Sequence, residues 1–261
     1  MAHHVSLDLW IRQNVSGIVL NGGLSRRMGT DKAAILIAGR PLIARSLDVL
    51  TELFDETLVV GRPVPGMASS PPGTRHAARG TQPDDRRQTT DDSGPTALSS
   101  ALCPLSSDSH ASRVPRHVPD LIPGAGPLGG IYTGLVAMTR PWGFFVACDM
   151  PCLDAAVIRR QLEVVRASGA DAVVPCWKEP SPQACTPYLE PLHAAYSQDC
   201  LPAVRRQLDS GDRRIRRFFC AVNVFCWDVL AEGISPRAFA NVNTKSDLAA
   251  LLGEEAERRA R

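Results

Sequence analysis

The chain has 261 residues, of which 44% are hydrophobic and 21% charged, and its formal net charge is +2 at pH 7. This length is enough to bury a sizeable core, and the small net charge gives no reason to expect nucleic acid as a partner. No stretch is long and apolar enough to suggest a membrane span, and the N-terminus lacks the pattern of a secretory signal, so we expect a cytoplasmic protein.

Short apolar strands alternate with amphipathic helices along the chain. We predict a first strand at Ser16–Leu20, a helix at Pro41–Phe54 and a second strand at Thr57–Val60. The later segments continue with a buried strand, a helix, a strand and a capped C-terminal helix, expected at 143–148, 154–168, 170–174 and from Thr244 onward. This pattern predicts a three-layer α/β fold, in which helices cover both faces of a mainly parallel sheet.

The composition changes between residue 62 and about residue 118. This segment is rich in Pro, Ser, Thr, Asp and Arg, and it contains no Phe, Tyr, Trp or Ile. Such a segment buries too little apolar surface to offset the entropy of ordering it. We therefore expect a long disordered insertion in a single domain of residues 1–261, with a regulatory linker or a partner-binding arm as the alternative.

The loop at residues 20–32 is the strongest candidate site. Paired Gly22 and Gly23 after a strand allow a sharp turn that points backbone N–H groups at phosphate oxygens. Arg27 and Lys32 supply the positive charge that departing pyrophosphate needs. The loop has neither the Gly-Lys-Ser/Thr of a Walker A motif nor a Rossmann dinucleotide turn, so it predicts another kind of phosphate cradle.

Asp149 comes directly after the buried strand at 143–148. Ligands of open α/β sheets bind at the carboxyl ends of the strands, and a carboxylate fixed there by Pro151 suits Mg²⁺. We expect Asp149 to be the metal ligand, with a helix cap as the alternative. Asp154 is better placed to be the cap.

Three further polar residues lie near predicted turns. Asp120 precedes a glycine-rich turn and a helix expected to begin near Leu128, where a carboxylate can contact a nucleobase or ribose, although a simple turn is the alternative. Asn241 and Asn243 alternate along an extended segment and so face opposite sides. One could support the metal or a phosphate while the other satisfies backbone groups, or both could simply form turns.

Together these segments resemble the molybdenum cofactor guanylyltransferases of the nucleotidyltransferase superfamily. The resemblance is carried by the loop at 20–32, by Asp120 with Gly-Pro-Leu-Gly-Gly-Ile at 126–131, by Cys-Asp-Met-Pro at 148–151 and by Asn-Val-Asn-Thr at 241–244. It implies a Rossmann-like nucleotidyltransferase fold that uses Mg²⁺. The catalytic residues that it implies are Lys32, Arg27 and Asp149. The nucleotide-binding residues that it implies are Leu20, Asn21, Gly22, Gly23, Lys32, Asp120 and Asp149.

The reaction that the resemblance implies is transfer of GMP from GTP to the terminal phosphate of molybdopterin, with release of pyrophosphate. The attacking phosphate is already an anion, so catalysis would depend on positioning and charge neutralisation rather than on a strong base. Molybdoenzymes or their chaperones are the expected protein partners. The alternatives are a cytidylyltransferase or sugar nucleotidyltransferase of the same fold, and a non-catalytic GTP-binding adaptor.

Two positions depart from the pattern of that family. Asn21 stands where a small alanine is usual and could change how the base or ribose is held. Lys245 stands where proline commonly follows the Asn-Val-Asn-Thr element.

The most basic stretch is formed by residues 205–206 and 211–217. It suits an anionic second substrate because Arg pairs well with phosphate, and a solvated helix end is an equally good interpretation. We interpret Phe218 and Phe219 as the start of a strand, and His193 as a packed or surface residue in a helical run. The cysteines lack paired spacing, which favours mostly buried thiols over a zinc site.

Overall fold

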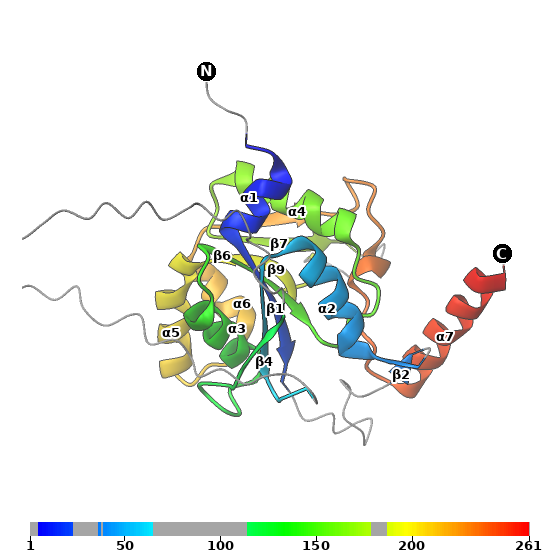
Figure 1. Cartoon of the computed structure of the whole chain (residues 1–261). Helices are drawn as coiled ribbons and strands as arrows, with labels where there is room; N and C mark the ends of the chain where they lie inside the picture. Colours follow the sequence, from blue (N-terminus) through cyan, green and yellow to red (C-terminus); the bar gives the residue numbers. More distant parts are fainter. Residues whose placement is uncertain (1–4, 23–35, 38, 65–113, 179–186, 261) are drawn as a thin grey trace, which may run out of the picture. The chain divides into compact units, whose positions relative to one another are not determined.

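The computed structural model describes residues 5–22, 36–37, 39–64, 114–178 and 187–260 (Figure 1). Its centre is an eight-stranded sheet with the order β10-β7-β9-β6-β1-β4-β5, in which β8 pairs with β7. The strands of this sheet are β1 (Val15–Asn21), β4 (Glu56–Gly61), β5 (Arg116–Val118), β6 (Trp142–Ala147), β7 (Ala172–Trp177), β8 (Tyr188–Leu189), β9 (His193–Ser197) and β10 (Val224–Asp228). A small second sheet pairs β2 (Leu36–Ile37) with β3 (Arg40–Pro41).

The large sheet is mainly parallel, as predicted. β1 lies in its middle and pairs in parallel with β4 on one side and β6 on the other, and β5 continues the parallel arrangement beyond β4. β10 is parallel to β7. β9 lies between β6 and β7 and is antiparallel to both. The first residue of β9 therefore lies at the edge of the sheet where β6 and β7 end.

Helices cover both faces of the sheet, which confirms the three-layer α/β architecture (Figure 1). One face carries α1 (Leu7–Asn14), α2 (Leu42–Leu53) and α4 (Ala155–Ser168). The other face carries α3 (Gly126–Ala137), α5 (Leu201–Asp209) and α6 (Ile215–Phe218). The remaining helical segments are η2 (Gln198–Cys200), η3 (Phe219–Ala221), η4 (Pro236–Phe239) and the C-terminal α7 (Lys245–Ala260).

The sequence of β1 explains why this strand is central. All its residues are buried, and successive side chains point to opposite faces of the sheet. Val15 and Val19 join the apolar cluster under α1, α2 and α4, whereas Ile18 and Leu20 join the cluster under α3 and α5. A strand that is buried on both faces needs a continuous apolar run, and Ser16–Leu20 provides most of one.

The predicted helix at 154–168 is confirmed, with both of its ends explained locally. Asp154 is the N-cap, because its Oδ1 accepts a hydrogen bond of 2.7 Å from the backbone N–H of Ala156. The helix ends at Gly169, whose φ of 61° lies in the left-handed region. Asp154 therefore has the capping role that its position predicted.

Three expectations about local structure are wrong. Arg116–Val118 forms β5 and pairs with β4, so the sheet resumes before the expected end of the insertion. His193 begins strand β9 rather than lying in a helix, because the run from this residue is buried along its whole length as a central strand. Phe218 ends α6 and Phe219 begins η3, where their rings pack together and against Tyr196 instead of forming a strand.

Most of the expected insertion, residues 65–113, lies outside the described residues. In the part of the chain that the structure describes, no helix is long and apolar enough to cross a membrane. The described cysteines are free thiols: Cys148, Cys176 and Cys200 are buried, Cys152 is half-buried, and Cys220 and Cys226 are exposed.

Candidate active site

The carboxyl ends of β6, β1, β4 and β5 meet at one edge of the sheet because these neighbouring strands are parallel. The chain leaves β1 at Asn21 and Gly22, and it reaches Asp120 and Asp149 two residues after β5 and β6 end. Open α/β sheets bind their ligands at such an edge. Three of the four predicted motif segments therefore meet in one place. The predicted site residues that lie outside the described part of the chain are Gly23, Arg27 and Lys32.

Asn21 joins the ends of two strands through its side chain. It is 1% exposed, and its Nδ2 donates a hydrogen bond of 2.9 Å to the carbonyl of Arg62, while the Arg62 N–H donates to the Asn21 carbonyl at 3.0 Å. Gly61 makes this approach possible, because its φ is 110° and a Cβ there would lie 2.7 Å from the Asn21 carbonyl oxygen. Asn21 Oδ1 is buried without a hydrogen-bond partner among the described residues.

Asp120 lies beside Gly22, the first glycine of the loop at 20–32. A Cβ added at Gly22 would be 3.7 Å from Oδ2 of Asp120. The pKa of Asp120 is raised by burial, and the nearby His117 offsets part of this rise. The His117 ring is fixed by a contact of 2.8 Å between its Nε2 and the carbonyl of Gly61. The site thus holds a half-buried carboxylate next to the glycine turn.

Asp149 is half-buried in the turn after β6. Its backbone carbonyl accepts a hydrogen bond of 2.9 Å from the N–H of Val242, which ties the Asn-Val-Asn segment to this turn. Val242 is itself buried, 3% exposed, between Asn241 and Asn243. Asn241 is half-buried and Asn243 is exposed, so the two asparagines have different surroundings.

Asn243 takes part in the start of α7. The N–H groups of Asn243 and Thr244 both donate to Oδ2 of Asp247 at 2.8 Å, and the Asp247 N–H donates to Thr244 Oγ1 at 3.1 Å. This reciprocal arrangement is a capping box. The backbone of Asn243 therefore serves the helix, while Asn241 lies beside the Asp149 turn.

Glu190 is a site residue that sequence reasoning missed. It is 3% exposed, and it follows β8 at the edge where β9 begins. The pKa of Glu190 is raised, first by burial and further by the negative charge of Asp149. Hydrogen bonds from Leu192, Tyr188 and Asn241 offset part of this rise. The signal in the sequence was an acidic residue directly before the apolar run at 191–196, but that run was interpreted as a helix.

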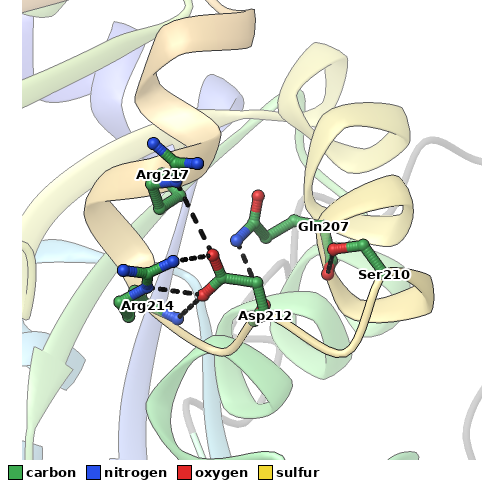
Figure 2. A network of polar contacts seen from close by, with 5 residues as sticks. All are labelled: Gln207, Ser210, Asp212, Arg214 and Arg217. Carbon is green, nitrogen blue, oxygen red and sulfur yellow. Dashed lines mark hydrogen bonds and ion pairs between the residues drawn. The ribbon is translucent and has the colours of Figure 1, made fainter.

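The basic stretch neutralises part of its own charge, as Figure 2 shows. Arg214 donates to Asp212 through its backbone N–H at 3.0 Å and through Nε at 2.9 Å, and the Nε of Arg217 lies 3.6 Å from the same carboxylate. The hydrogen bonds from Arg214 hold the pKa of Asp212 well below its usual range. Gln207 Nε2 also donates to the Asp212 carbonyl, at 3.1 Å (Figure 2). This part of the stretch is best interpreted as a solvated helix end.

Two other arginines of this stretch donate hydrogen bonds to backbone carbonyls near the site. Arg213 donates to the carbonyl of Gly124, in the turn between Asp120 and α3. Arg216 Nη2 donates at 3.4 Å to the carbonyl of Leu189, the residue before Glu190. The stretch is therefore tied to the turn before α3 and to the segment that precedes Glu190.

A cavity of about 680 Å³ opens beside the turn that follows Asp149. Pro151 to Ala155 form one wall, and Arg45 of α2, Arg237 of η4 and Leu251 of α7 contribute to the others. This volume is within the range of small-molecule sites, and the arginines give it positive groups. Two arginines and one carboxylate, Asp154, line the cavity, so it suits part of an anionic ligand.

The sequence from residue 17 to residue 223 matches the model of the family described as the MobA-like NTP transferase domain. A probable molybdenum cofactor guanylyltransferase from Natronomonas pharaonis is 30% identical over 237 residues, which cover 89% of this chain and 94% of that protein. Another, from Pelotomaculum thermopropionicum, is 29% identical over 238 residues and covers 89% of both chains.

Two solved structures share the fold of this chain over most of its length. The molybdopterin-guanine dinucleotide biosynthesis protein A of Archaeoglobus fulgidus aligns with a TM-score of 0.63 and 21% identity, covering 93% of this chain and 99% of that one. The 2-C-methyl-D-erythritol 4-phosphate cytidylyltransferase of Thermus thermophilus aligns with a TM-score of 0.56 and 14% identity, covering 93% and 98%. At these identities the structures establish the fold alone.

Proposed function

The chain belongs to the family of MobA-like NTP transferase domains and is a nucleotidyltransferase of molybdenum cofactor biosynthesis, and we propose that it transfers GMP from GTP to the terminal phosphate of molybdopterin. The products of this reaction are molybdopterin guanine dinucleotide and pyrophosphate. The observation that carries the proposal is the meeting of Gly22, Asp120 and Asp149 at the carboxyl edge of the sheet. We further propose that molybdoenzymes or their chaperones receive the product.

In the proposed reaction, an oxygen of the molybdopterin phosphate forms a bond to the α-phosphorus of GTP. The bond from that phosphorus to the oxygen bridging to the β-phosphate breaks, and pyrophosphate leaves with the electron pair. The attacking oxygen is already anionic, so no residue has to remove a proton from it. The residues instead have to position two anions and neutralise their charge.

Most of the predicted residues have a part in this proposal. Backbone N–H groups at Gly22 and Gly23 hold phosphate oxygens, and Asp120 accepts hydrogen bonds from the ribose or base. Arg27 and Lys32, which lie outside the described residues, keep their proposed role of neutralising the departing pyrophosphate. The cavity beside Asp149 is proposed as the space for the second substrate.

Magnesium is the cofactor that we propose, with Asp149 as its protein ligand. The residues present fit this ion: Asp149 is a half-buried carboxylate, and Asn241 Oδ1 is a buried oxygen without a hydrogen-bond partner among the described residues. Mg²⁺ prefers oxygen ligands and is usually held by one or two carboxylates together with substrate phosphates and water. When bound, it would neutralise charge on the phosphate groups.

The test is pyrophosphate release by the purified chain with molybdenum-loaded molybdopterin and Mg²⁺, with GTP and CTP compared in parallel. We expect turnover with GTP that Asp149→Asn reduces about 100-fold or more, because one carboxylate charge in the site is lost. Asp55→Asn is the matched control, since it makes the same change just before β4 begins, at the opposite edge of the sheet, where Asp55 pairs with Arg12 at 2.9 Å. Lys32→Ala should also lower turnover.

Other outcomes would change the assignment. Turnover with CTP instead of GTP would make the chain a cytidylyltransferase. Absence of pyrophosphate release with either nucleotide, from a folded protein that binds GTP, would overturn the proposed reaction in favour of a GTP-binding adaptor. Equal activity of Asp149→Asn and Asp55→Asn would remove Asp149 from the catalytic set.

A further inference from the structure

Glu190 is a buried carboxylate that the proposed reaction does not use. It is 3% exposed and is surrounded by donors: the Leu192 N–H donates to Oε1 at 3.1 Å, and the Tyr188 hydroxyl donates to Oε2 at 3.2 Å. The side chain of Asn241 makes a third hydrogen bond to it. A buried carboxylate with three donors is held in one orientation.

The hydrogen bond from Asn241 fixes which end of its amide faces Glu190. This bond lowers the pKa of Glu190, which is the effect of a donor on a carboxylate, so Asn241 faces Glu190 with its NH₂ group. Its carbonyl oxygen, Oδ1, is then turned away from Glu190. That oxygen is buried and has no hydrogen-bond partner among the described residues.

A buried oxygen without a hydrogen-bond partner is destabilising unless a ligand supplies one. Asn241 is attached directly to the Asp149 turn, because the next residue, Val242, donates its N–H to the Asp149 carbonyl at 2.9 Å. The segment around Glu190 is held to the same edge of the sheet, since the Ala147 N–H donates to the carbonyl of Leu192 at 2.9 Å. The oxygen is therefore in the neighbourhood of the proposed metal ligand.

We propose that Glu190 is a positioning residue that fixes the Asn241 amide, so that its carbonyl oxygen rather than its NH₂ group is available to the divalent cation held by Asp149. This inference rests on the proposed function for the identity of the cation and the nucleotide. An amide oxygen is a suitable ligand for a hard cation, and an NH₂ group is not. Residues that orient metal ligands from behind typically change metal affinity when they are substituted.

The decisive variant is Glu190→Gln, which preserves shape but introduces a donor. The oxygen of the introduced amide would accept from the Leu192 N–H, and its NH₂ group would then donate to Oδ1 of Asn241 and turn that side chain around. Binding of Mn²⁺ in the presence of GTP and without the second substrate, measured by electron paramagnetic resonance, reports on the site without turnover. We expect Glu190→Gln to weaken Mn²⁺ binding about 10-fold to 100-fold.

Adding Asn241→Asp to Glu190→Gln should restore most of the lost affinity. The new carboxylate can accept from the introduced NH₂ group with one oxygen and present the other to the cation. A role of Glu190 in folding alone would not be rescued in this way. Glu56→Gln is the matched control, because Glu56 accepts hydrogen bonds from Thr139 N–H at 2.9 Å and Oγ1 at 3.1 Å where β4 begins, at the opposite edge of the sheet.

Unchanged Mn²⁺ affinity in folded Glu190→Gln, or failure of the double variant to recover it, would overturn the proposal. So would absence of Mn²⁺ binding by the wild-type chain with both GTP and CTP. If Mn²⁺ binds with CTP alone, the proposal that GTP is the substrate is wrong. The same comparison of Glu190 variants, made with CTP, then tests the role of Glu190. Pyrophosphate release measured on the same preparations tests the reaction separately.

Discussion

Burial changes the acid–base behaviour of His193. It is fully buried, with its Nδ1 3.2 Å from Oε1 of Gln161, and its Nε2 has no hydrogen-bond partner among the described residues. The rings of Phe144 and Phe239 lie edge-on to it, with centroids 5.1 and 4.7 Å away. Burial lowers the pKa of His193 to about 4, so the folded chain holds a neutral imidazole.

Stability should therefore fall between pH 6.5 and pH 4. In this range the unfolded chain binds a proton at His193 that the folded chain does not bind, so acid favours unfolding, by up to about 3 kcal/mol at the lower end. Urea unfolding of the wild type and of His193→Gln at a series of pH values measures this contribution. We expect the variant to lose less stability on acidification, and parallel curves would contradict the assignment.

At the scale of elements, α3 packs unusually closely on β6. A Cβ added at Gly134 would lie 2.5 Å from Cε1 of Phe145 and 3.2 Å from Cγ2 of Ile18, so the helix can reach this distance only with glycine there. This contact matters for the site because α3 begins directly after the turn that carries Asp120. Local sequence suggested the helix but not how near the sheet it lies.

Gly134→Ala should lower the free energy of unfolding by about 1–3 kcal/mol, because the new methyl group overlaps a buried aromatic ring. Gly253→Ala in α7 is the control with the same chemical change, since nothing lies within 4 Å of an added Cβ there. This control should gain up to about 1 kcal/mol from helix propensity. Chemical denaturation of both variants checks the pair, and equal effects would refute the packing argument.

At the scale of the whole molecule, the direction of β9 determines the composition of the site. Because β9 is antiparallel to β6 and β7, the residues before it lie at the edge where the parallel strands end. Glu190 reaches Asn241 and the Asp149 turn in this way. The connection between β4 and β5 contains the segment at 65–113, and the two strands that flank it pair in parallel.

Replacing residues 65–113 by a Gly/Ser linker of about 12 residues should preserve folding, because such a linker spans about 20 Å on average and can return from the end of β4 to the start of β5. We expect the Tm to change by less than about 4 °C, corresponding to roughly 1 kcal/mol in a chain of this size. Thermal unfolding and pyrophosphate release are measured together. An unchanged Tm with activity lost would show that the segment serves the reaction rather than the fold.

The sequence alone determined the alternation of strands and helices, the cap at Asp154 and the segments that gather at the sheet edge. These features depend on the spacing of apolar residues, on turn-forming residues and on side chains that bond to nearby backbone, so they can be recognised from neighbouring positions. The strands β5 and β9 were missed, because a short strand and a fully buried strand carry no alternating pattern.

Tertiary structure alone decided the roles of Asn21, Arg213 and Glu190. Their partners are Arg62, Gly124 and Asn241, which are distant in the chain and become neighbours only when the strands pair in a particular order and direction. Hydrogen bonds of this kind depend on register and burial, and neither is encoded in local spacing. The motifs thus predicted which edge of the sheet carries the site, and the fold decided which other side chains hold that site in place.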